Sequence, residues 1–254
     1  MIDWLVVLLA LSVNFFAEQI PFMRTFEHSW KWFEDFFVWF ADKDYLQRLH
    51  PILHCFAVLV PVPIVIGFVS YLAEDLFGGL AFVLHFVILL FCFTDGPFYN
   101  KNQHQCSVKV VACHERYIAI IFWFMILGPL GASLYRLTTL LSYHVNQSSS
   151  NDLAFRKATV SCHGLLAWLP VRITALIFAL VGNFNQVMKV FSELVGQVAL
   201  SGQDILLQCA KSALGLHSQT AWSVGHANDI DQLIKRTLGS WLLLWGLLLL
   251  ALLD

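Results

Sequence analysis

Apolar segments of membrane-spanning length recur along this 254-residue chain, and they constrain its fold more than any other feature. Hydrophobic residues make up 58% of the chain and charged residues 13%, unlike the composition of soluble domains. Peptide groups inside a bilayer must be satisfied within the protein, and the sequence has no transmembrane β pattern. The sequence therefore predicts an all-α, polytopic integral membrane protein with the lipid bilayer as its partner.

Six apolar runs are expected to cross the bilayer within a single membrane domain, residues 1–254. They occupy residues 2–18, 52–73, 76–94, 117–141, 160–183 and 238–253. Pro61 and Pro63 are expected to kink the second run, and Gly128-Pro129 to kink the fourth. Four or five spans are the alternative, because Lys and Arg occur in nearly every loop and barely discriminate between topologies.

Two further segments have the periodicity of amphipathic helices. Aromatic side chains recur at steps of four and three within residues 24–49, and apolar side chains follow helical spacing within residues 186–214. Such helices lie at the membrane interface or cover the bundle. Residues 95–116 and 215–228 are expected to be polar loops, and residues 147–152 a linker.

Charge and motif content exclude several classes of function. Lys and Arg number 15 against 17 acidic residues, so no nucleic-acid binding is expected. The chain contains no dinucleotide-binding, P-loop, zinc-protease or serine-hydrolase motif. The six cysteines form no CxxC pair and are interpreted as apolar fillers, and Cys106, Cys113 and His114 match no zinc spacing. No metal site is predicted, and the sequence assigns neither a cofactor nor an oligomeric state.

Arg172 is the most unusual residue of the apolar segments. It follows Pro170 by two positions, and proline favours the first turn of a helix, so a helix is predicted to begin there. Arg172 would then lie at the positive end of the helix dipole, and a lipid-exposed arginine costs about 2.5 to 3.5 kcal/mol. An anion would relieve both costs. It is either Glu115, in a structural ion pair, or a small carboxylate or phosphate ligand.

A hypothetical anion-binding site is therefore predicted around Arg172. Its other members are polar residues beside apolar segments: Arg136, Glu115, His114 and His163. Arg136 has the alternative of extending to lipid headgroups. His85, deep in an apolar run, is a functional candidate by position, although a hydrogen bond to a backbone carbonyl accounts for it better. No residue is predicted to be catalytic.

Two segments carry the most specific motifs, HERYIAIIFWFMILGPLGASLYRL at residues 114–137 and LAWLPVRITALIFALVGNF at residues 166–184. Together they resemble the AmpE family of bacterial inner-membrane proteins, which are described as regulatory modulators of β-lactamase induction linked to cell-wall recycling. The resemblance implies a multi-pass, non-catalytic regulator that senses a ligand and passes its state to a protein partner.

AmpE proteins are in turn similar to the CobD/CbiB family, membrane enzymes that attach an aminopropanol unit to a corrinoid carboxyl. The alternative implied is a nucleotide-dependent synthase with a divergent site. That family's ENxxD pattern falls here on Val111 and Ala112, with Glu115 about where its Asp stands. Its NTLD pattern keeps only Thr139-Leu140, and its aspartate pair before PxR has no counterpart. Nucleotide activation of a carboxyl needs carboxylates to hold magnesium, so these replacements favour the regulator.

Overall fold

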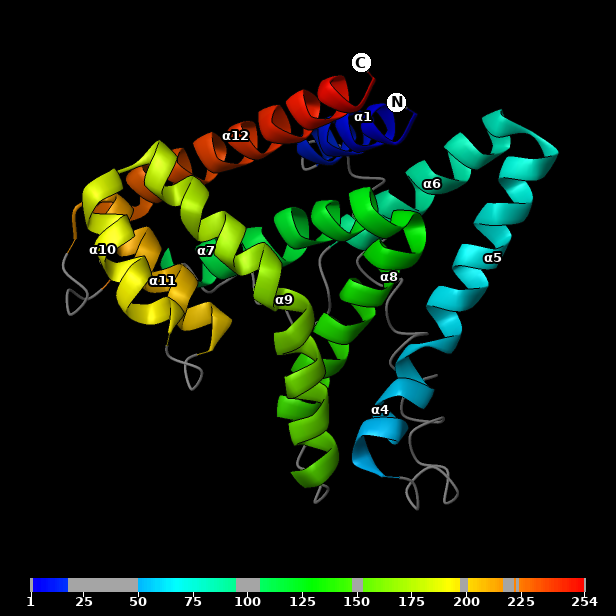
Figure 1. Cartoon of the computed structure of the whole chain (residues 1–254), viewed down its shortest axis with the longest axis horizontal. Helices are drawn as coiled ribbons and strands as arrows, with labels where there is room; N and C mark the ends of the chain where they lie inside the picture. The colour runs from blue at the N-terminus through cyan, green and yellow to red at the C-terminus, as the bar shows by residue number, and fades with distance from the viewer. Residues whose placement is uncertain are drawn as a thin grey trace. The chain divides into compact units, whose positions relative to one another are not determined.

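The computed structural model describes residues 2–17, 50–94, 106–147, 153–196, 201–216, 222 and 224–253. Throughout these ranges the regular elements are helices and no strand is present, which confirms the all-α prediction (Figure 1). The chain divides into two compact units. Unit 1 is Met1–Asn100 with Ile120–His163, and unit 2 is Lys101–Ala119 with Gly164–Asp254. The single membrane domain and its six spans stay predictions, and the helix predicted at 24–49 lies outside the described residues.

Unit 1 begins with four apolar helices. They are α1 (Ile2–Ala17), α4 (Pro51–Leu59), α5 (Pro61–Leu76) and α6 (Gly78–Phe93), and the last two form a hairpin. The break between α4 and α5 falls at Val60, immediately before Pro61, which confirms the predicted kink. The hairpin turns at Phe77, where the backbone is extended, and α6 packs against both α5 and α1 (Figure 1).

Helix α8 (Ala119–Gln147) is kinked at the predicted Gly-Pro pair. Gly128 has φ 63° and ψ −151°, a conformation that glycine adopts without a steric penalty, and Pro129 follows it. Beyond the kink, the position of a Cβ on Gly131 would overlap the Trp123 carbonyl oxygen. The small residues therefore permit a close approach inside the kinked helix, and α8 ends where the predicted linker begins.

Helix α9 (Leu153–Val181) runs without interruption through Pro170, so the prediction that a helix begins at this proline is wrong. A proline in a helix interior removes one backbone donor, which a membrane helix tolerates when neighbouring groups compensate. The N-terminal part of α9 packs with α4 and α8 in the core of unit 1. This core contains Cys55, Val58, Leu59, Leu137, Leu140, Leu141, Val145, Phe155 and Ala158.

Unit 2 contains the C-terminal part of α9, from Gly164 on, together with shorter helices and one long terminal helix. The helices other than α9 are α7 (Cys106–Cys113), η2 (His114–Ile118), α10 (Phe184–Val195), α11 (Gly202–Ala213), η3 (Val224–His226) and α12 (Ala227–Leu253). Helices α10 and α11 lie side by side, and α7 packs against α11 and α12 (Figure 1). The amphipathic role predicted for residues 186–214 stays a prediction.

Part of the predicted polar loop at 95–116 is helical instead. Residues 95–105 lie outside the described residues, but α7 and η2 continue directly into α8, and Val110 is buried. Lys109 is one of the charged residues that suggested a loop. It pairs with a distant residue instead: its Nζ lies 2.9 Å from Asp231 Oδ1 of α12. The predicted loop at 215–228 is likewise shortened by η3 and by the start of α12.

Three helical stretches of the described chain are long and apolar enough to cross a membrane: Pro51–Leu76, Ser107–Gln147 and Leu153–Val181. Trp4–Val13 and Gly78–Phe93 are apolar but shorter. Large apolar side chains such as Ile64, Val65 and Phe68 are exposed on α5, as expected of a helix that faces lipid. The chain is therefore a helical membrane protein.

Candidate functional site

The five predicted site residues fall into two groups. His114, Glu115 and Arg172 belong to unit 2, whereas Arg136 and His163 belong to unit 1. In unit 2, Glu115 and His114 contact residues that are distant in sequence, whereas Arg172 contacts its own helix. In unit 1, Arg136 contacts the end of α6.

Glu115 lies in the π-helical stretch η2, between α7 and α8. Such stretches are rare and often mark functional sites. The Glu115 side chain is buried, and its Oε1 accepts a hydrogen bond from Gln203 Nε2 at 3.0 Å. A buried carboxylate needs such donors, because desolvation without hydrogen bonds is costly. The amide of Gln203 therefore helps to hold the carboxylate in place.

Gln203 can reach Glu115 because α11 packs against α7, the helix that continues into η2. The start of α11 also lies close to α9. A Cβ on Gly202 would lie 3.2 Å from Val171 Cγ2, so the glycine permits this close approach. Ser201 caps the helix by accepting a hydrogen bond from the Asp204 backbone N–H at 3.2 Å. The first turn of α11, the π-helical stretch and the middle of α9 thus meet within unit 2.

His114 is joined to α9 through Thr174. The His114 Nδ1 atom lies 3.1 Å from Thr174 Oγ1, and that hydroxyl donates to the Pro170 carbonyl at 2.7 Å. A hydroxyl has one proton, so Thr174 Oγ1 accepts from His114, and Nδ1 carries the hydrogen. In the neutral imidazole, Nε2 then holds the lone pair. The network assigns this tautomer.

Arg172 folds back along its own helix. Its Nη1 donates to the Trp168 carbonyl oxygen at 3.1 Å, and its guanidinium carbon lies 4.0 Å from the centroid of the Trp168 ring. Over the described part of the chain, no ion pair joins it to Glu115, which accepts from Gln203 instead. Of the two partners predicted for Arg172, the structural ion pair is thus absent there, and the ligand stays a prediction.

Arg136 and His163 have structural contacts in unit 1. Arg136 is buried, and its Nη2 donates to the Thr94 carbonyl at the end of α6, where a cation complements the helix dipole. The side chain is thus enclosed by the protein. His163 stacks on Tyr135 with ring centroids 5.8 Å apart. Their roles in anion binding stay predictions.

His85 is buried in unit 1 beside a carboxylate. Its Nε2 lies 3.6 Å from Glu74 Oε1 of α5, and its ring meets Phe124 edge-on with centroids 6.2 Å apart. The pair links the two helices of the hairpin, so His85 has a role in joining α5 and α6. Across the described residues, no group of three or more His, Cys, Asp or Glu side chains is placed to hold a metal ion.

Sequence reasoning missed Gln203 and Thr174. Gln203 lies 88 positions from Glu115, and Thr174 lies 60 positions from His114. Gln203 belongs to no motif, and Thr174 lies within the motif segment 166–184 but was not singled out there. No local signal identifies them, because their partners are selected by the packing of α9 and α11.

Comparison with known proteins adds one similarity. No family model and no solved structure matches the chain. The chain is 38% identical over 65 residues to "Cobalamin biosynthesis protein CobD" of Chromobacterium violaceum. The match covers 26% of this chain and 21% of the relative, so it spans about a fifth of that protein's length. It supports the similarity to the CobD/CbiB family inferred from the sequence, and the resemblance to AmpE proteins stays a prediction.

Proposed function

We propose that this chain is a multi-pass protein of the bacterial inner membrane and a non-catalytic regulator of the AmpE type, linked to β-lactamase induction and cell-wall recycling. The motif segments at 114–137 and 166–184 support this reading. Three helical stretches of spanning length support a multi-pass arrangement. The replacement of the CobD-type acidic patterns supports a protein without synthase chemistry.

The regulator would bind a small anionic ligand through Arg172. The environment of this side chain is the main support for such binding. Arg172 is half-buried in a helix of spanning length, and its contacts are to its own helix, at the Trp168 carbonyl and ring. Neither contact neutralises the charge. A bound carboxylate or phosphate would neutralise this charge, through paired hydrogen bonds to the planar guanidinium.

The remaining predicted residues would support this contact. Arg136 already donates to Thr94, so Arg172 is the better placed cation. The hydrogen bond between Glu115 and Gln203 joins the first turn of α11 to η2. Gly202 in the same turn lies against Val171 of α9, the neighbour of Arg172 in sequence. A bound anion would thus act on the contact between these helices, and a protein partner would detect the change.

Anion binding is tested by thermal unfolding of the purified chain in lipid nanodiscs with inorganic phosphate or acetate. We expect either anion to raise the midpoint of the unsubstituted protein and of Arg116→Leu, but not of Arg172→Leu. Arg116 is a matched control, since its guanidinium also lies on an aromatic ring, 5.0 Å from the Tyr117 centroid. An Arg172→Leu protein that keeps the shift contradicts the ligand role.

The regulatory role is tested in a deletion strain. We expect β-lactamase induction to change on deletion, and to be restored by the unsubstituted chain and by Arg116→Leu but not by Arg172→Leu. Unchanged induction in the deletion strain would reject the AmpE-type role.

The second candidate is a CobD-like synthase, favoured by the 65-residue similarity to a cobalamin biosynthesis protein. Glu115 is the residue that would act in it, because it stands near the acidic position of the ENxxD pattern and is buried. This reading predicts hydrolysis of ATP with magnesium by the purified chain, lost in Glu115→Gln, and cobalamin auxotrophy of the deletion strain. Absence of both results removes the synthase.

A further inference from the structure

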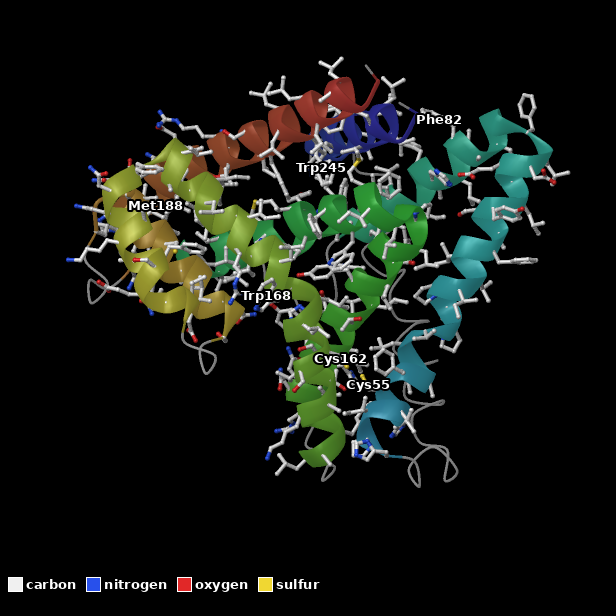
Figure 2. All side chains as sticks on the ribbon, in the orientation of Figure 1. Cys55, Phe82, Cys162, Trp168, Met188 and Trp245 are labelled. Atoms are coloured by element: carbon white, nitrogen blue, oxygen red, sulfur yellow. The ribbon has the colours of Figure 1, made fainter. Side chains whose placement is uncertain are left out.

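Two cysteines from distant parts of the sequence meet inside unit 1. Cys55 of α4 is fully buried in the core of the unit, and Cys162 of α9 packs against the same core. Figure 2 shows the two labelled side chains between α4 and α9. Both thiols therefore lie at the same part of this core (Figure 2). Both cysteines are in the free thiol state.

One face of α9 presents Cys162 to Cys55. Thr159 lies one turn before Cys162 on the same face, and its Oγ1 donates to Cys55 Sγ at 3.8 Å across 104 positions of sequence. This contact ties the Cys55 sulfur to the face of α9 that carries Cys162. The two thiols and the Thr159 hydroxyl therefore lie at a core made mainly of apolar side chains.

We propose that Cys55 and Cys162 are a redox-active dithiol that converts reversibly to a disulfide joining α4 to α9. Two S–H bonds break and one S–S bond forms. The two electrons and two protons pass to a lipid-soluble quinone, which becomes the quinol. A small thiol reverses the step by exchange, through a mixed disulfide.

The apolar surroundings of Cys55 and Cys162 favour a lipid-soluble oxidant. Cys55 lies among apolar side chains such as Val58 and Leu141, so water-borne reagents have poor access to it. Cys162 is only half-buried, on a helix long and apolar enough to cross the membrane. An apolar two-electron acceptor dissolved in the bilayer can therefore reach the pair from the Cys162 side.

The other buried thiol of unit 1 provides the matched control. Cys92 of α6 is as deeply buried as Cys55, but its ionisable neighbour is the Arg136 guanidinium and not a thiol. Burial alone would make Cys92 behave like Cys55, whereas pairing distinguishes them.

The test uses the full chain in lipid nanodiscs, treated with decylubiquinone and mapped by mass spectrometry. We expect a bridged pair of peptides containing Cys55 and Cys162, two hydrogen atoms lighter than the separate peptides and released by dithiothreitol. The bridge should disappear in Cys55→Ser and Cys162→Ser and persist in Cys92→Ser. No bridge, or an equal yield of bridges to Cys92, overturns the proposal.

A second measurement needs no substitution and so does not depend on a variant's folding. Phenylarsine oxide is apolar and condenses with two adjacent thiols, releasing one water. We expect phenylarsine oxide to bind both Cys55 and Cys162 of the unsubstituted chain. The quinone should then no longer form the disulfide between them. Binding of the arsenical elsewhere, or a bridge that forms despite it, contradicts the pairing.

Discussion

The guanidinium carbon of Arg172 lies 4.0 Å from the centroid of the Trp168 ring, one helical turn earlier on α9. The same side chain donates to the Trp168 carbonyl, so a single residue supplies both contacts. The ring and the carbonyl of Trp168 together hold the guanidinium beside its own helix. This arrangement orders the cation without neutralising it.

Substituting Trp168 by Leu should remove the ring contact and leave the carbonyl contact. Since Trp168 is about half exposed, at 52%, we expect a loss of about 0.5–1 kcal/mol in the free energy of unfolding. Denaturant unfolding in detergent micelles measures it. Trp168→Phe, which retains a weaker aromatic face, should lose less, and equal losses in both variants would show that the ring face is unimportant.

Substituting Gly182 by Ala should disturb the corner between α9 and α10. A Cβ at position 182 would lie 2.6 Å from both the Cβ and the carbonyl oxygen of Ala213, and Asn183 N–H already donates to that carbonyl at 3.1 Å. We expect a loss of about 1–3 kcal/mol, as for other overpacked sites. Thermal unfolding measures the effect.

Gly164 is the matched control for this substitution. It lies in the interior of α9, and a Cβ there would meet no described atom within 4 Å. Gly164→Ala should therefore stabilise the protein by about 0.5–1 kcal/mol through helix propensity. If both alanine variants shift stability in the same direction, the close approach at Gly182 is not what limits that position.

Substituting Gln203 by Leu should leave the buried Glu115 carboxylate without one of its donors. We expect a loss of about 1–3 kcal/mol, the usual cost of an unsatisfied buried group. When Glu115 is already replaced by Gln, Gln203→Leu should lower the free energy of unfolding by less. A buried neutral amide costs less free energy to leave unpaired than a buried carboxylate does. A double-mutant cycle measures this difference, and strictly additive effects would contradict the coupling.

Cys209 of α11 should make the folded protein less stable as the solution becomes alkaline. Burial raises the pKa of its thiol from 9.0 to about 12. Between these values the unfolded chain loses the thiol proton and the folded chain keeps it, so stability falls as pH rises through 9.0. The slope of stability against pH should be shallower in Cys209→Ala. An identical slope in the variant would show that this thiol does not titrate as expected.

Local sequence signals predicted the kinks correctly, because each depends on the residues at the kink itself. Pro61 cannot continue the hydrogen-bonding pattern of α4, and Gly128 adopts a positive φ that other residues avoid. The same local reasoning failed at Pro170. A proline can lie inside a helix when the surrounding packing compensates for the missing backbone donor. Local sequence carries no information about that packing.

The sequence by itself determined that the chain is a helical membrane protein with two bent apolar segments. Long apolar runs leave the backbone no other way to satisfy its peptide groups in lipid. Only the tertiary structure decided that Glu115 accepts from Gln203, that Lys109 pairs with Asp231 and that Cys55 meets Cys162. A buried polar group takes its partner from whichever segment packs beside it, and local helical preference carries no information about that choice.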